Sequence, residues 1–383
     1  MLVMTPGPIA VDHRVIAAMN RPAITHQSRY FGDILDDVLE MLKPIFRTTS
    51  WVTVLPGSGR LGLEAALASV VERGDRTVHV VNGTFASWAV EIARRAGAEP
   101  TVVEGPWGGP VDLRAVAQAV ERERPKVVAM VHSETSTGAR YELEGVAEIC
   151  RRHDALFLVD VISSVGCMPF EMDAWGVDLA VCTSNKGLGS LIGLSLVAAS
   201  PRAYEAMDRR RTVCQSYALD LKRWKDTFFG RPFPRPYPVV PSTHLVYALQ
   251  EACRQVLEEG LEARWARHHR YAEATRRAVE AAGLELFPQR DLAGDCVTAV
   301  RVPEGLDEGQ ILRGMEANGV LISGSMPGPA KGKLFRLSHQ GVQASEEMLV
   351  PTLAALERTL RGLGYRVAPG TMVAAFEAAL AEG

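Results

Sequence analysis

The sequence predicts an α/β fold, in which a large domain with a mostly parallel sheet carries a smaller α+β domain at its carboxyl end. Three observations lead to this prediction. The 383 residues exceed one ordinary domain, and their 47% hydrophobic and 23% charged content is typical of globular proteins. From Thr53 to Ala199, β-branched runs alternate with amphipathic helical segments. A proline-rich stretch at 231–241 then precedes a second, different pattern.

The first pattern predicts βαβ units. Helical periodicity covers 61–74, 86–98, 112–125 and 145–155. Strand-like runs cover 77–82, 100–104, 126–133, 156–161, 179–184 and 194–200. Strands that alternate with helices pair in parallel and are buried on both faces. Ligands of such sheets bind beyond the carboxyl ends of the strands, so the residues there are the candidates for function.

The second pattern begins after 231–241, which we expect to be a loop because its prolines lack N–H donors. A helical stretch at 242–283, with a break near Gly260, follows the loop. The remaining elements are strands at 296–303, 320–325 and 333–339 and helices at 307–319 and 345–364. We therefore expect a large domain over 13–245 and a small one over 246–383.

The charge balance argues against a nucleic-acid or membrane-surface protein, since 42 basic and 45 acidic residues give a net charge of −3 without blocks of like charge. The sequence contains no run of eighteen apolar residues, so it predicts no membrane span. The first fifteen residues lack the pattern of a signal peptide. The six cysteines form no CxxC pair, which favours reduced thiols and a cytoplasmic location. No ligand spacing typical of a metal site occurs.

Lys186 follows the run 179–184 in an apolar, glycine-rich setting. A desolvated lysine loses its charge more easily and becomes a nucleophile. A lysine whose chain reaches along apolar surface to water would fit the same local sequence.

Asp160 ends the apolar run 156–160, so its carboxylate should lie partly buried at the same sheet edge as Lys186. A helix N-cap is the alternative interpretation. Together, an acid and a lysine at successive strand ends suit the binding of a pyridine derivative. The acid would pair with the ring nitrogen, and the lysine amine would form a Schiff base.

Gly57, Gly59 and Gly62 form a GxGxxG pattern before a helical segment. A dinucleotide site would need an acid at the end of the next strand, where Asn82 stands instead. A glycine-serine turn at a helix N-terminus would instead present N–H groups and the hydroxyl of Ser58 to one phosphate. Because Arg60 adds charge, we favour a phosphate monoester.

Three further candidates follow other strand ends or lie on the small domain. Thr135, in the hydroxyl-rich run 132–138, could hydrogen-bond a ring, although such a run is also typical of a simple loop. Phe85 could stack on a planar ring or belong to the core. Arg336 could bind a carboxylate through two hydrogen bonds or lie on the surface.

Taken in order, TPGP, PGSGRLGLEAAL, HSETSTG, LVDVISSVG, MDAWGVD and TSNKG resemble the class V aminotransferases that depend on pyridoxal 5′-phosphate. The resemblance runs from about Thr5 to Arg361 and is nearest to the alanine–glyoxylate, serine–glyoxylate and serine–pyruvate enzymes. It implies the fold type I of pyridoxal-phosphate enzymes, with a seven-stranded sheet in the large domain and residues 1–12 as a segment that lines the active site.

The resemblance also implies roles. Lys186 would bind the cofactor as a Schiff base and move the proton between Cα and C4′, and Asp160 would pair with the ring nitrogen. The other cofactor-binding residues would be Ser58, Gly59, Arg60, Phe85, Thr135 and Asn185, together with Tyr237 from the neighbouring subunit of a homodimer. Arg336 and Gly7 would bind the substrate.

Three positions depart from the family pattern. Asn185 stands where most of the glyoxylate enzymes have glutamine, and Val240 stands where a threonine commonly contacts the phosphate. Residues 190–193 replace a Pro-Pro-Gly sequence. These departures concern the identity of the substrate more than the use of the cofactor.

We therefore expect ping-pong transamination from alanine or serine to glyoxylate or pyruvate. Ureidoglycine–glyoxylate and 2-aminoethylphosphonate–pyruvate transamination stay open as alternatives. A lyase of the cysteine-desulfurase type would need a cysteine on a mobile loop, and a nicotinamide oxidoreductase would need a dinucleotide at Gly57–Gly62.

Overall fold

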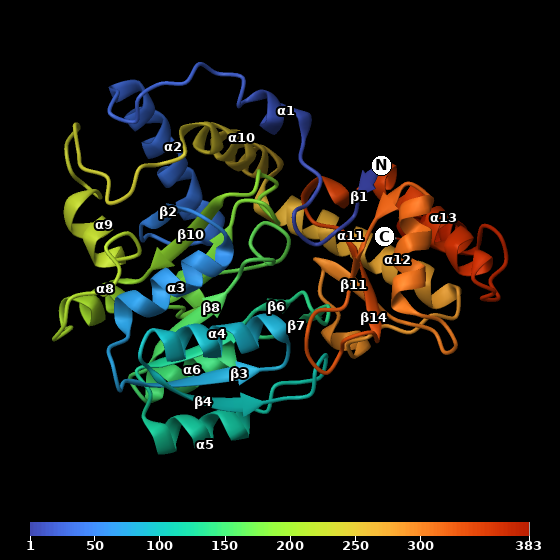
Figure 1. The fold of residues 1–383 in the computed structure, drawn as a ribbon, viewed down its shortest axis with the longest axis horizontal. Helices are drawn as coiled ribbons and strands as arrows, with labels where there is room; N and C mark the ends of the chain where they lie inside the picture. Colours follow the sequence, from blue (N-terminus) through green and yellow to red (C-terminus); the bar gives the residue numbers. More distant parts are fainter. Residues whose placement is uncertain (383) are drawn as a thin grey trace.

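The computed structural model describes residues 1–382, and a seven-stranded sheet lies at the centre of its larger part (Figure 1). The strand order is β2, β10, β9, β8, β5, β3, β4. In that order the strands span Val52–Pro56, Leu194–Ala199, Leu179–Thr183, Leu156–Asp160, Val127–Val131, Arg76–Val81 and Glu99–Glu104. Only β10 is antiparallel to its neighbours. The predicted mostly parallel sheet is confirmed.

Helices cover both faces of this sheet, which is why every residue of β5, β8 and β9 is buried. They are α2 (Arg29–Phe46), α3 (Gly59–Val70), α4 (Thr84–Arg95), α5 (Leu113–Glu123), α6 (Glu144–Arg152) and α10 (Thr243–Glu259). Side chains set several of the helix starts: Ser28 caps α2, and Asp112 caps α5 by accepting the N–H groups of Arg114 and Ala115. Segment 231–241 forms neither helix nor strand, as predicted.

The smaller part contains an antiparallel sheet with the order β11 (Val297–Arg301), β14 (Leu334–Ser338), β13 (Ser323–Gly324). Its helices are α11 (Leu261–Ala281), α12 (Glu308–Ala317), α13 (Glu346–Gly362) and α14 (Thr371–Glu382). The chain's first strand, β1 (Leu2–Val3), belongs here as well, because it pairs in parallel with β12 (Val320–Leu321). The amino terminus is thus attached to the carboxyl-terminal part of the fold (Figure 1).

Short elements complete the chain. They are α1 (His13–Ala17), β6 (Ser133–Glu134), β7 (Ala139–Arg140), α7 (Met172–Trp175), α8 (Pro201–Asp208), α9 (Leu221–Thr227), η1 (Arg290–Leu292) and η2 (Gly341–Gln343). Within residues 1–382, no helix combines the length and the apolar character that a bilayer crossing needs.

The apolar side chains form two main cores. The first contains residues between 31 and 261, including α10, which packs on α2. The second contains Met4 and residues between 274 and 380. The proposed division of the domains at residue 245 stays a prediction.

Candidate active site

One cavity of about 280 Å³ lies at the carboxyl edge of the large sheet, where the sequence places the functional residues. Lys186, Asp160 and Arg336 all line it. Of the other predicted residues, Gly7, Ser58, Gly59, Arg60, Phe85, Thr135 and Asn185 line it too. The residues come from the large sheet, the amino-terminal segment and the small domain, so the fold brings together side chains that are up to 329 residues apart, from Gly7 to Arg336.

Lys186 is partly buried, and its amine lies beyond the end of β9. Its Nζ donates to Ser163 Oγ at 2.9 Å and lies 5.4 Å from the centre of the Phe85 ring. Burial lowers the pKa of Lys186, and the nearby Asp160 carboxylate opposes this shift. A buried amine of lowered pKa reaches the neutral, nucleophilic state more easily than an exposed lysine.

Asp160 is the last residue of β8 and is almost fully buried. One of its oxygens accepts the N–H of Ile162 at 2.9 Å, and no side chain among residues 1–382 donates a hydrogen bond to it. Burial raises the pKa of Asp160 to about 7, while the Ile162 N–H acts in the opposite direction. A cationic group placed beside this carboxylate would lower that pKa again, so the position suits a protonated ring nitrogen.

The amino end of α3 has the properties of a phosphate site. Ser58 is the N-cap, yet its side chain makes no capping hydrogen bond within residues 1–382. The hydroxyl and the first N–H groups of the helix therefore remain available to an anion, and the helix dipole favours negative charge there. The Arg60 guanidinium lies 4.2 Å from the centre of the Trp88 ring at the same cavity.

Arg336, on β14, is buried with no acidic partner among the described residues. Its Nε and Nη2 donate to the Gly324 carbonyl, and its Nη1 donates to the Thr135 carbonyl at 3.0 Å. Burial lowers its pKa to about 10. Carbonyl groups orient the guanidinium without neutralising it, so an incoming carboxylate would complete the pair.

Gly7 closes the cavity from the amino-terminal segment. Its φ of +153° is rarely adopted by other residues, and a Cβ at this position would come within 3.0 Å of Lys186 Cε. Only glycine lets this segment lie directly against the lysine.

Two further residues contribute to the site, although neither was predicted from the sequence as a site residue. Ser163 holds the Lys186 amine, and it belongs to the strand-end run that drew attention to Asp160. Glu134 is fully buried and accepts the N–H groups of Phe85, Ala86 and Ser136, so it fixes the start of α4 and the Phe85 ring. Burial raises its pKa. The sequence signal for Glu134 is an acidic residue inside the run 132–138, which was interpreted only through its hydroxyl residues.

Tyr237 does not line this cavity. It packs against Phe228 and His26, and its buried hydroxyl has no hydrogen-bond partner within residues 1–382. Because its predicted role is in the neighbouring subunit's site, that role stays a prediction. Of the departures from the family pattern, Asn185 accepts a hydrogen bond from Thr183 at 2.9 Å, and Ile192 is half exposed at the cavity.

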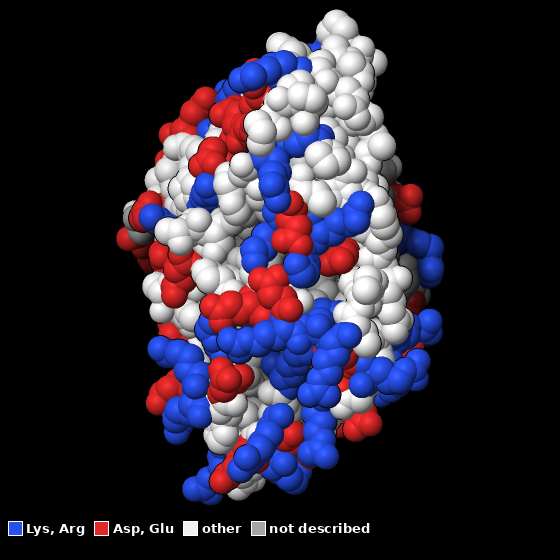
Figure 2. All heavy atoms as spheres, turned by 90° about the vertical axis from the view of Figure 1, so that its left-hand side faces the viewer, with Lys and Arg blue, Asp and Glu red and all other residues white. Residues whose placement is uncertain are grey.

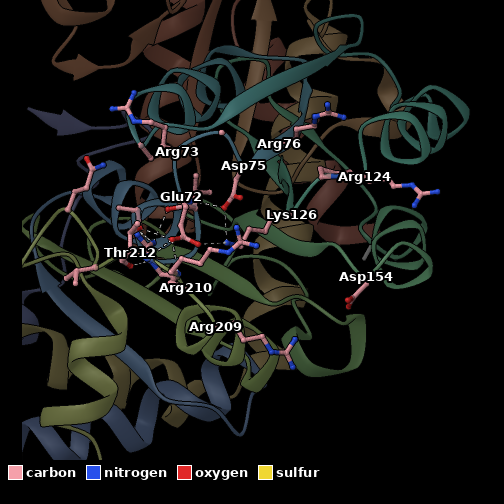
Figure 3. Close-up of a pocket in the computed structure, with 18 of the residues that line it drawn as sticks. Glu72, Arg73, Asp75, Arg76, Arg124, Lys126, Asp154, Arg209, Arg210 and Thr212 are labelled. Atoms are coloured by element: carbon pink, nitrogen blue, oxygen red, sulfur yellow. Dashed lines mark hydrogen bonds and ion pairs between the residues drawn. The ribbon is translucent and has the colours of Figure 1, made fainter.

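A larger cavity, of about 920 Å³, lies at the opposite, amino edge of the same sheet (Figure 3). It contains none of the residues above. The volume of a cavity does not identify the chemistry, which depends here on the lysine, the buried acid and the buried arginine of the smaller cavity.

Comparisons with known proteins agree with a catalytic role for the smaller cavity. The sequence profile of the family described as aminotransferase class-V matches residues 14–330. The L-aspartate–glyoxylate aminotransferase of Paracoccus denitrificans is 35% identical over 97% of this chain and 94% of its own length. The serine–glyoxylate aminotransferase of Arabidopsis thaliana is 35% identical over 97% and 93%. The crystal structure of the ureidoglycine–glyoxylate aminotransferase of Bacillus subtilis matches 100% of this chain and 98% of its own, with a TM-score of 0.95 and 33% identity.

Proposed function

Because the chain belongs to the class V aminotransferases, we propose that it moves the amino group of a small L-amino acid, alanine or serine, to glyoxylate or pyruvate. The chain is a pyridoxal 5′-phosphate-dependent aminotransferase of fold type I. The observation that carries the proposal is the single cavity lined by Lys186, Asp160 and Arg336. These groups are an amine, an acid and a carboxylate-binding cation, and transamination of an amino acid needs all three.

The residues present fit the cofactor. The uncapped end of α3, with Ser58 and Gly59, would hold its phosphate, and Arg60 would add positive charge. Asp160 would pair with its ring nitrogen, Phe85 would cover one face of the ring, and Thr135 and Asn185 would line its edge. When bound, pyridoxal phosphate supplies a ring that takes up the electrons released when a substrate Cα–H bond is broken.

Lys186 is the group that holds the cofactor and then moves a proton to and from the substrate Cα. Its lowered pKa keeps a fraction of the amine neutral, and only the neutral amine can accept that proton. Ser163 accepts a hydrogen bond from the Nζ, which keeps the amine in the cavity while it is not bound to the cofactor.

Arg336 positions the substrate by binding its α-carboxylate. Because the Gly324 and Thr135 carbonyls already fix the guanidinium, little side-chain entropy is lost on binding. Gly7 lies on the Lys186 side of the cavity and lets the amino-terminal segment contact the lysine side chain. Ile192, in place of the family's Pro-Pro-Gly sequence, adds an apolar wall that suits a small side chain.

The proposed assembly is a homodimer in which Tyr237 reaches the neighbour's cofactor. The support is the match of Tyr237 to the tyrosine that the neighbouring subunit contributes in the family. Light scattering with size-exclusion chromatography tests the dimer. A Tyr237→Phe variant, with weaker binding of the cofactor and an unchanged oligomeric state, would support the shared site.

The thiols do not favour the cysteine-desulfurase alternative. Five of the six cysteines are buried, and Cys214 is half-buried beside the Ala68 carbonyl at the amino edge of the sheet. A lyase of that type would need a thiol that can reach the cavity of Lys186.

The deciding experiment is the visible absorption spectrum of the purified holoenzyme, recorded before and after addition of one amino donor without acceptor. We expect the yellow band of the bound cofactor to bleach with L-alanine or L-serine and to return with glyoxylate or pyruvate. D-alanine is the matched control. A band that responds only to L-aspartate or ureidoglycine would overturn the donor assignment, and absence of any band after incubation with the cofactor would overturn the proposal.

A further inference from the structure

The large cavity at the amino edge of the sheet is built from turns that are distant in sequence, and three of them supply its lysine and arginine side chains. The first joins α3 to β3 and includes Arg73, the second joins α5 to β5 and includes Arg124, and the third follows α8 and includes Arg211. Strands β3, β5 and β8 start at this cavity, whereas Asp160 ends β8 at the active site. The cavity is therefore separate from the catalytic machinery.

The lining of this cavity is strongly basic. Seven of its side chains are lysine or arginine and three are aspartate or glutamate, although the whole chain has a net charge of −3. Figure 2 shows Lys and Arg side chains gathered on the lower half of the face that carries α8 and α9. A concave surface lined by charge of one sign concentrates the field that attracts an oppositely charged ligand.

Two of the three acids are already used to build the cavity. Glu72 accepts the N–H groups of Arg211 and Thr212 and the Thr212 hydroxyl, which holds the third turn in place. These hydrogen bonds, led by that of the hydroxyl, keep the pKa of Glu72 low. Asp75 accepts a hydrogen bond from the Lys126 Nζ at 2.8 Å. Neither carboxylate remains to neutralise the arginines.

Arg210 joins the cavity to the carboxyl end of α3. Its Nη1 donates to the Ala68 and Val71 carbonyls, which are among the last acceptors of that helix. This guanidinium fixes the floor of the cavity, while other arginines form its mouth.

The side chains of Arg73, Arg124 and Arg211 make no hydrogen bond or ion pair with any of residues 1–382, and all three residues are exposed at the mouth of the cavity. Figure 3 shows the guanidinium groups of Arg73 and Arg124 on different sides of the cavity, well apart from each other. Arg76 and Arg209 lie at other sides and also form ion pairs, with Glu123 and Glu205. A single phosphate or carboxylate could not contact several of them at once. A ligand that does so must carry its negative charges along a chain.

We propose that this cavity binds a polyphosphate anion, that is, a chain of two or more linked phosphate groups. Guanidinium groups bind phosphate oxygens through paired hydrogen bonds and stay charged at any physiological pH. A volume of about 920 Å³ accommodates such a ligand, whereas docking surfaces for proteins are flatter. Ala68, Val71, Pro125 and Val213 supply an apolar part of the lining that a nucleoside attached to the phosphates would cover.

Isothermal titration calorimetry of the holoenzyme with inorganic tripolyphosphate, with ATP and with orthophosphate tests this proposal. We expect tripolyphosphate or ATP to bind saturably with one site per chain, and orthophosphate to bind far more weakly. Equal affinity for the first two would identify the phosphate chain as the ligand. Tighter binding of ATP would show that the nucleoside contributes.

The variant Arg73→Gln/Arg124→Gln/Arg211→Gln should bind about 10-fold to 100-fold more weakly, the effect of losing three partly exposed ion pairs. The matched control is Arg313→Gln/Arg361→Gln/Arg366→Gln, which removes the same charge from exposed positions of the small domain. It should bind as the wild type does. The three single variants at the cavity repeat the test if the triple variant does not fold.

Four outcomes would overturn the proposal. They are the absence of saturable binding of either polyphosphate, full binding by the triple variant, equal weakening in the control variant, and binding of poly-glutamate without binding of polyphosphate. The last would identify the cavity as a surface for an acidic polypeptide.

Discussion

The two edges of the large sheet hold charge in opposite ways. At the carboxyl edge, Asp160 and Arg336 are buried and Lys186 is partly buried in a small cavity. Desolvation raises the pKa of Asp160 and lowers the pKa values of Lys186 and Arg336, which favours the neutral form of each group. At the amino edge, arginines surround a cavity more than three times as large and are exposed to water. Catalysis needs ionisable groups whose charged form costs free energy to bury, because burial shifts their pKa values. Attraction of an anion needs only positive charges that have no acidic partner.

The largest expected effect of a substitution is at the amine. Lys186→Ala removes the group that holds the cofactor and moves the proton, so kcat should fall by about 10⁴-fold. Steady-state transamination assays measure the loss, with Lys222→Ala as a surface control. Retention of a tenth of the activity would mean that the buried amine is not the catalytic group.

Asp160→Asn should lower the activity and raise the stability of the folded protein. We expect kcat to fall by about 100-fold, because the neutral amide cannot hold a protonated ring nitrogen. The cofactor-free variant should nevertheless be more stable than the wild type at pH 8, by about 4 kcal/mol.

The sign follows from the pKa of Asp160, which folding raises to about 7. Folding favours the protonated carboxyl, so the cost of the buried charge is absent below the unfolded pKa and grows as the pH rises to 7. Urea unfolding of the cofactor-free proteins at pH 5 and pH 8 checks this. A stability difference that does not shrink at pH 5 would contradict the assignment of the shift to burial of this carboxyl.

Arg336→Gln should weaken the binding of the substrate and leave the binding of the cofactor unchanged. The loss of one charge-assisted pair predicts a decrease of about 100-fold in kcat/KM for the amino donor, mostly through KM. The affinity for the cofactor, followed by its absorption band, should be unchanged. If the affinity for the cofactor falls instead, Arg336 belongs to the cofactor site.

Ser163→Ala should have a smaller effect, because Ser163 only positions the amine. Without this acceptor the protonated amine of Lys186 loses a partner, so its pKa should fall further and the acidic limb of the pH–rate profile should shift to lower pH. The rate at the optimum should fall about threefold to tenfold. Ser163→Thr should restore the profile, whereas a purely structural role would leave the profile in place in both variants.

The smallest effect is expected at the amino edge. The variant Arg73→Gln/Arg124→Gln/Arg211→Gln should keep kcat and KM within about twofold of the wild type, because none of these residues lines the catalytic cavity. Assays without added polyphosphate measure this. A larger loss would mean that the two edges of the sheet are coupled.

Sequence patterns predicted part of the carboxyl edge well, because three functional residues there end or follow a β-branched run whose strand the structure confirms. The strand before Ser58, β2, was not among the predicted runs. Asp160 ends β8, Thr135 follows β5 and Lys186 follows β9. The rule that parallel strands end at a common edge then brings them together without any knowledge of the tertiary fold.

Other features gave no local signal. β1 is two residues long, and it pairs with β12 more than 300 residues away, so only the tertiary fold defines it. α14 (Thr371–Glu382) begins after a Pro-Gly pair, and the sequence patterns predict no element beyond residue 364. Each turn of the basic cavity contributes few arginines to a chain that is rich in arginine, and only their proximity in space makes a site.

The pairing of β1 with β12 has a practical consequence for handling the protein. Main-chain and side-chain bonds tie Val3 and Met4 to the small domain, through the side chain of Gln343 and the N–H of Ser338. Gly7, three residues later, lies against Lys186 of the large domain. The removal of residues 1–4 would therefore disturb the wall of the active site.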